Sequence, residues 1–204
     1  MKERSFMHSW SRSAVLVAAF LVATAAIAQQ ALPSSGRVDF AVTYDASYAG
    51  LVQGNAPFWM NGDGAELSID AFHGFGFSAH VMGFHTANTG SGVPLNLVTT
   101  TFGPHYTWHP RLAKRSLSIF GEGLIGEAHG FKSVFPSTSG SSISALSFAS
   151  EAGGGIDLDI SHHVSIRLVE ASWLRTQFPN SSLDVQNNLA LGAGLVIHSA
   201  TSRH

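Results

Sequence analysis

Residues 185–198 read VQNNLALGAGLVIH, and this stretch decides the fold. Every second residue from Leu189 to Ile197 is apolar, and the positions between them are mostly small. A period of two places successive side chains on opposite faces of an extended chain. The stretch is therefore predicted to be a β-strand with one apolar face.

The same alternation recurs eight times along the chain. The predicted strands are residues 38–49, 64–73, 75–87, 95–108, 116–131, 144–161, 164–176 and 185–198. Short turns alternate with longer polar loops, which are residues 50–63, 88–94, 132–143 and 177–184. Bacterial outer-membrane barrels typically have an even number of strands in which apolar and polar residues alternate, joined by short turns and longer loops in turn. The predicted fold class is all-β, an eight-stranded antiparallel up-and-down transmembrane β-barrel.

The first 28 residues have the order of a secretory signal peptide. Basic residues come first, an apolar run covers residues 14–23, and Ala26-Ile27-Ala28 supplies the small residues of a cleavage site. The run is short for a membrane-spanning helix, although an uncleaved anchor is the alternative. We expect a signal peptide over 1–28, a periplasmic lead over 29–37, the barrel over 38–198 and a tail over 199–204.

Composition excludes several classes of protein. The chain has no cysteine, which excludes a lipoprotein anchor, a disulfide framework and a thiolate metal site. Its net charge of −2 and the lack of a basic stripe give no basis for binding nucleic acid. Charged residues make up 12%, about half the usual share, which favours a barrel whose outside faces lipid.

Alternation also sorts the charges between the two faces. Most mid-strand carboxylates have the parity opposite to the apolar positions. An eight-stranded barrel is just wide enough for side chains to fill it, so these groups should form a packed polar interior. Pairing of unlike charges there offsets part of their desolvation. The predicted lumen network consists of Asp70, Glu122, Glu151, Asp157 and Arg167.

One strand departs from strict alternation. Glu170 would lie among the lipid-facing residues of 164–176 if the strand were regular. A β-bulge inserts one extra residue and reverses the parity beyond it. We therefore expect a bulge near residues 168–170 that turns Glu170 inward and both Trp173 and Arg175 outward.

Aromatic residues suggest two further features. Outward parity near the strand ends predicts an aromatic girdle containing Tyr106, Trp108 and Trp173. A separate group lies in the polar segment 50–63, where three apolar residues are consecutive. Phe58, Trp59 and Met60 are a candidate contact site of that loop, or alternatively dip into the outer leaflet or cap the barrel mouth.

No metal, cofactor or catalytic site is expected from the sequence. Eleven histidines are present, but without cysteine or a helical histidine spacing they give only a weak metal signal. His198 and Ser199 are neighbours and so point to opposite faces, and no Ser-His-Asp constellation is evident. Phosphate-loop and dinucleotide signatures are absent as well.

The C-terminal half resembles a known family. SFASEAGGGIDLDISHHVSIRLVEASWLRTQF at 147–178, followed by residues 185–198, is similar to the OmpA-like outer-membrane β-barrels, specifically porin-family members of acidobacterial genomes. The matching elements are the glycine-rich strand 152–159, the turn at His163, the strand from Arg167 to Thr176, and residues 186–188. Family members commonly end on an aromatic residue, whereas here Ile197-His198 is followed by residues 199–204.

The resemblance implies a non-enzymatic barrel in the outer membrane of a Gram-negative bacterium. Its implied partners are outer-membrane lipid and lipopolysaccharide, the barrel-assembly machinery and periplasmic chaperones. We expect a structural or surface-interaction role carried by the extracellular loops, with a surface partner that the sequence does not specify. The alternatives are a small porin, a lipocalin-like periplasmic barrel with inverted faces, and a lipid A-modifying enzyme.

Overall fold

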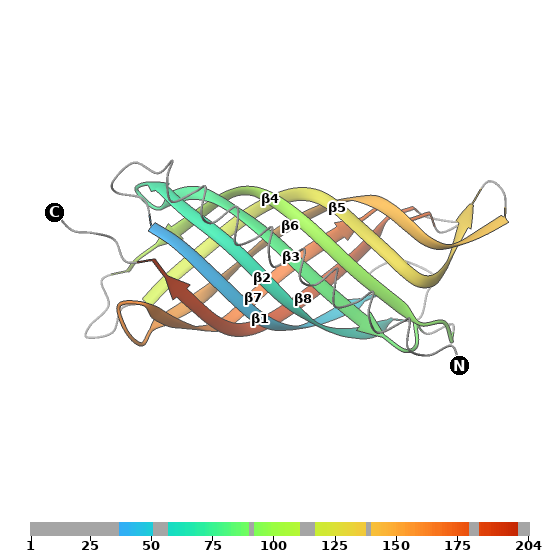
Figure 1. The fold of residues 1–204 in the computed structure, drawn as a ribbon, viewed down its shortest axis with the longest axis horizontal. Helices are drawn as coiled ribbons and strands as arrows, with labels where there is room; N and C mark the ends of the chain where they lie inside the picture. The colour runs from blue at the N-terminus through green and yellow to red at the C-terminus, as the bar shows by residue number, and fades with distance from the viewer. Residues whose placement is uncertain are drawn as a thin grey trace, which may run out of the picture. The chain divides into compact units, whose positions relative to one another are not determined.

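The computed structural model describes residues 37–50, 57–89, 92–110, 117–137, 140–179 and 184–199. It contains β1 (Arg37–Ala49), β2 (Phe58–Phe72), β3 (Phe75–Thr86), β4 (Leu95–Trp108), β5 (Leu117–Ser137), β6 (Gly140–Asp159), β7 (Val164–Thr176) and β8 (Gln186–His198). Each strand pairs antiparallel with its neighbours, and β1 pairs with β8 to close a barrel (Figure 1). The predicted eight-stranded antiparallel barrel is confirmed. The proposed signal peptide and residues 200–204 lie outside the described residues.

The described ranges contain no helix with the length and apolar character needed to cross a membrane.

Strand register determines how much room the barrel encloses. Stepping from Arg37 through the paired residue on each successive strand returns to β1 at Ser47, ten residues further along. In a closed barrel the number of strands and this stagger together set the strand tilt and the diameter. With eight strands the interior accommodates side chains and little else.

The two ends of the barrel differ in their connections. We call the end with the β2–β3, β4–β5 and β6–β7 connections the turn end, and the opposite end the loop end. The β2–β3 turn consists of His73 and Gly74, whose φ angles are 52° and 83°. Positive φ at both central residues is typical of the tight hairpin turn that matches strand twist. The amide of Thr107 donates to the carbonyl of Gly74 at 2.7 Å, which ties this turn to β4.

The outer face of the barrel is predominantly apolar. Large hydrophobic side chains project from every strand and are exposed, among them Val42, Tyr44, Phe77, Phe102, Ile125, Phe148, Leu168, Leu191 and Leu195. Tyr106, Trp108 and Trp173 also point outward, with the first two near the turn end of β4. The charged and hydroxyl side chains that alternate with them are buried inside. The polarity is therefore the reverse of that of a water-soluble protein.

The predicted loop at 50–63 is wrong for its second half, because β2 begins at Phe58. Met60 is 1% exposed and points inward, whereas Trp59 lies outside with its ring 5.1 Å from that of Tyr48. Residues 61–64 are Asn, Gly, Asp and Gly, which are common in turns, but here they lie within β2, and polar side chains of the interior surround Gly64. Phe58, Trp59 and Met60 therefore do not form one exposed apolar group.

The predicted loop at 132–143 is also wrong for the residues that the structure describes there, because β5 extends to Ser137 and β6 begins at Gly140. Phe135, Pro136 and Ser137 pair with Ser142, Ser141 and Gly140 in that order. Lys132 has a φ of 57°, and the register shifts between Phe131 and Phe135. The residues between these two positions therefore form an irregularity within β5, and not a loop. The resulting β5–β6 hairpin extends beyond the other strands at the loop end (Figure 1).

The bulge expected on β7 is confirmed. Ile156 of β6 pairs with Val169 and the next residue, Asp157, pairs with Arg167, so Leu168 has no partner on β6. Beyond this point Glu170 is 3% exposed, while Trp173 and Arg175 face outward. One extra residue thus allows two charged side chains three positions apart to point into the same interior.

Gly64 provides a test of how tightly the interior is packed. A Cβ atom there would lie 2.5 Å from Thr43 Oγ1, 2.7 Å from Asp45 Oδ2 and 3.1 Å from His80 Nε2. Gly64→Ala should lower the free energy of unfolding by about 1–3 kcal/mol because it overpacks these groups. Gly83→Ala is the matched control, since nothing lies within 4 Å of a Cβ at Gly83. Equal denaturation midpoints in detergent for the two variants would contradict this packing.

Candidate functional site

The interior of the barrel has an apolar and a polar layer. The apolar layer, which we call the apolar plug, fills the loop end with Ala49, Met60, Met82, Phe84, Leu97, Ala128, Phe135, Ala149, Leu174, Phe178 and Ala190. All are buried. Alternation along the strands could have identified the apolar plug from the sequence. Met82 and Phe84 follow the inward-facing His80 at steps of two residues on β3, so they share its face. The polar layer fills the rest of the interior and is the candidate functional site.

Arg167 is the centre of the polar layer. Its Nε lies 3.0 Å from Asp157 Oδ1, and its Nη1 lies 2.5 Å from Glu66 Oε2 and 2.6 Å from Glu170 Oε2. The guanidinium also lies over the Phe120 ring, 4.1 Å from the centroid. Arg167 is 2% exposed, so one permanent cation is shared by three buried carboxylates. Planar guanidinium geometry allows several such charge-assisted bonds at once.

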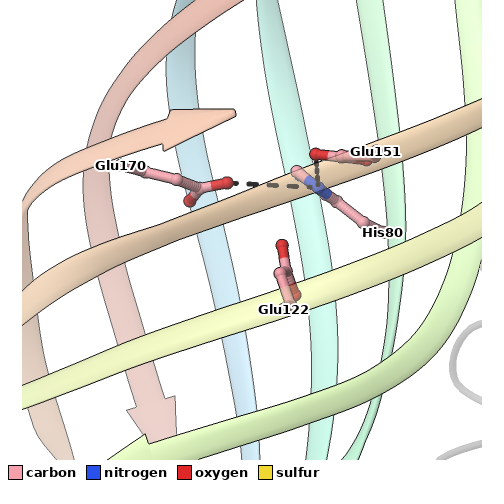
Figure 2. Close-up of side chains that lie close together, drawn as sticks. All are labelled: His80, Glu122, Glu151 and Glu170. Carbon is pink, nitrogen blue, oxygen red and sulfur yellow. Dashed lines mark hydrogen bonds and ion pairs between the residues drawn. The ribbon is translucent and has the colours of Figure 1, made fainter. Parts of the chain in front are cut away.

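A second group, the glutamate–histidine cluster, lies beside Arg167. It consists of His80, Glu122, Glu151 and Glu170, from β3, β5, β6 and β7 (Figure 2). His80 Nδ1 lies 3.2 Å from Glu151 Oε1 and 4.0 Å from Glu170 Oε1. Figure 2 shows the carboxylate of Glu122 directed toward the same space.

His105 extends the polar layer toward the turn end. Its Nδ1 lies 3.6 Å from Glu122 Oε2 and 3.7 Å from Glu66 Oε1, and its Nε2 lies 2.7 Å from Thr107 Oγ1. The imidazole stacks on Phe120 at 5.5 Å between ring centroids. Phe120 therefore packs against both the His105 ring and the Arg167 guanidinium.

The structure brings together only part of the predicted lumen network. Arg167 contacts Asp157, whereas Glu122 and Glu151 belong to the glutamate–histidine cluster. Asp70 is also inward, but its Oδ1 is buried without a hydrogen-bond partner. Glu66 and Glu170 were not among the predicted members of the network. Alternation alone places Glu66 inside, and the bulge expected on β7 places Glu170 inside.

The turn end is closed by a rim cluster of Arg37, Asp39, Asp159, Ser165 and His198. His198 Nε2 lies 2.6 Å from Ser165 Oγ, and His198 Nδ1 lies 2.8 Å from Asp39 Oδ1. These are the contacts of a Ser-His-Asp triad, so the expectation that no such constellation exists is wrong. The three residues come from β7, β8 and β1, which meet only when the barrel closes.

The rim cluster lacks the access that a nucleophile needs. Ser165 is completely buried, and its hydroxyl also donates to Asp159 Oδ1 at 2.5 Å. The Arg37 guanidinium lies against the imidazole, with Nη2 2.6 Å from His198 Nδ1. A serine nucleophile must reach its substrate and pass its proton to the histidine. The geometry is therefore that of a polar closure between β1, β7 and β8.

The fold and its filled interior define the class as a small eight-stranded up-and-down β-barrel. Solved structures share this fold. Ail, the attachment invasion locus protein of Yersinia pestis, aligns over 80% of this chain and 99% of its own, with 17% identity and a TM-score of 0.54. Neisserial surface protein A aligns over 79% and 96%, with 10% identity and a TM-score of 0.55. No protein-family model and no curated protein matches the chain.

Arg167→Leu tests the central ion pairs. The substitution leaves Glu66, Asp157 and Glu170 buried without their cation, so we expect a loss of about 3–5 kcal/mol in the free energy of unfolding. Arg175→Leu on the same strand is the control, because Arg175 is exposed on the outer face and its loss should change stability by less than about 0.5 kcal/mol. An unchanged denaturation midpoint for Arg167→Leu would contradict the network.

A fluorophosphonate probe tests the Ser165 triad. The folded protein in detergent should remain unlabelled, because the Ser165 hydroxyl is buried and directed at Asp159. Ser165→Ala should give the same background signal by mass spectrometry. Labelling of the folded protein that disappears in Ser165→Ala would instead identify a reactive serine and favour the lipid-modifying enzyme.

Proposed function

We propose that the protein is a non-enzymatic outer-membrane β-barrel of a Gram-negative bacterium, with a structural or surface-interaction role and an interior that does not conduct. The observation that carries this proposal is the reversal of polarity, with apolar side chains outside and buried charges inside. Such an arrangement is stable where the surroundings are lipid, and closure of β1 on β8 satisfies the backbone without a free edge. Outward Tyr106, Trp108 and Trp173 suit the two membrane interfaces.

The filled interior argues against the small porin. The apolar plug closes the loop end, and the Arg167 network and the rim cluster occupy the rest. A lipocalin-like barrel would require an apolar interior around a ligand and a polar outer face, which is the opposite of the observed distribution. Both alternatives are therefore less well supported than a filled membrane barrel.

The β5–β6 hairpin is the segment best suited to a surface role. It is formed by strands of 21 and 20 residues, whereas the other six have 12 to 15. Val134 and Ile143 on it are 62% and 78% exposed. Exposed apolar side chains beyond the membrane-facing band are suited to contact with another molecule. The names of the structural neighbours, a surface protein and an attachment invasion protein, agree with such a role.

Cell fractionation combined with epitope insertion tests this proposal. The protein should be recovered in the outer-membrane fraction, and a tag inserted after Ser137 should bind antibody on intact cells. A tag inserted at Gly74 is the matched control at the opposite end of the barrel and should bind antibody only after permeabilisation. Recovery in the soluble periplasmic fraction would refute the membrane location, and a large steady conductance in planar bilayers would favour the porin.

A further inference from the structure

The three glutamates of the glutamate–histidine cluster are held in the same way. In each carboxylate Oε2 is fixed from outside the cluster: Ser78 Oγ donates to Glu122 at 2.6 Å, Thr101 Oγ1 to Glu151 at 2.9 Å, and Arg167 Nη1 to Glu170 at 2.6 Å. The other oxygens of Glu151 and Glu170 face His80 Nδ1. Three anchored carboxylates and an imidazole therefore converge on one small space (Figure 2).

Within the glutamate–histidine cluster, Glu122 Oε1 is a buried oxygen that the described residues do not satisfy. This oxygen has no hydrogen-bond partner, and the Glu122 side chain that carries it is 0% exposed. Because Oε2 is occupied by Ser78 and faces His105, Oε1 is the oxygen left for the space beside His80. A buried carboxylate oxygen without a partner is costly, and its position indicates where a cation would be stabilised.

The charged groups of the polar layer are also compatible with a bound cation. Glu66, Glu122, Glu151, Asp157 and Glu170 are buried, and Arg167 is the permanent cation among them. His80 and His105 add at most one positive charge each when protonated. The carboxyl groups outnumber the cationic groups in either case, which is compatible with an additional cation.

We propose that His80, Glu122, Glu151 and Glu170 bind one divalent first-row transition-metal ion, such as Mn²⁺ or Zn²⁺. One ligand atom from each residue lies within 4.8 Å of the others. Ligands on opposite sides of a metal at about 2.1 Å are roughly 4.2 Å apart, so small side-chain movements complete the site. Three carboxylates with one imidazole suit Mn²⁺ or Zn²⁺ better than a soft metal. The inference does not depend on the proposed cellular location.

Such an ion would connect β3, β5, β6 and β7 at the centre of the barrel. Ser78, Thr101 and Arg167 orient the ligands, as hydrogen-bonding partners of metal ligands commonly do. The apolar plug and the rim cluster close the two ends, so the ion is expected to enter while the barrel folds. Binding then couples to folding and releases the proton from His80 Nδ1.

Refolding of the purified full chain in detergent tests the proposal. The protein is unfolded with chelator, refolded with Mn²⁺ or Zn²⁺, desalted, and assayed for metal content. We expect one ion per folded chain, a higher thermal unfolding midpoint than in chelator, and, for Mn²⁺, electron spin echo modulation from a single imidazole nitrogen. Absence of a retained ion, or a retained ion without effect on the midpoint, would overturn the proposal.

Substitutions distinguish this site from histidines at the surface. Glu122→Gln keeps an acceptor for Ser78 but removes the charge, and His80→Gln removes the imidazole, so each should weaken metal binding at least about 100-fold. Glu127→Gln is the matched control on β5, because Glu127 is exposed on the outer face, and it should retain the ion. Equal metal content in all three variants would place the ion elsewhere and overturn the assignment. If neither site variant folds, the electron spin echo modulation of the wild-type protein with Mn²⁺ tests the assignment, because the absence of an imidazole nitrogen signal would overturn it.

Discussion

The buried guanidinium of Arg167 is the interaction on which the rest of the interior depends. It neutralises carboxylates from β2, β6 and β7, and removal of one partner from such a group leaves an uncompensated buried charge. Glu170 links this network to His80, and Phe120 links it to His105. The bulge at Leu168 is what allows Arg167 and Glu170 to share one face of β7. A local backbone irregularity thus determines the arrangement of charges across the barrel.

The outer face follows from the same division of the strands. Each strand contributes alternate residues to a narrow interior and to the surroundings, so a polar interior leaves the apolar residues outside. A barrel of this polarity is stable in lipid because its backbone hydrogen bonds are all made between strands. The far part of the β5–β6 hairpin departs from this pattern, since Val134 and Ile143 are exposed there while Phe135 packs in the apolar plug.

Parity predicted the faces of the strands, and the bulge followed from the position of Glu170 alone. Contacts within the interior could not be predicted in the same way, because they depend on height along the barrel as well as on face. Glu66 and Arg167 are 101 residues apart and meet only when β2 and β7 enclose the same volume. The Ser165, His198 and Asp39 contacts require closure of β1 on β8. The segment 50–63 is rich in glycine and polar residues, which are typical of loops, yet residues 58–63 belong to β2.

The apolar plug makes the two ends of the interior unequal. Its side chains are at most 7% exposed, whereas the side chains of Arg37, Asp39 and Asp159 at the turn end are 17% to 26% exposed. The rim cluster is therefore the less deeply buried of the two closures, and the apolar plug is the more deeply buried one. The interior is thus asymmetric along the barrel axis, with apolar side chains at one end and partly exposed charged side chains at the other.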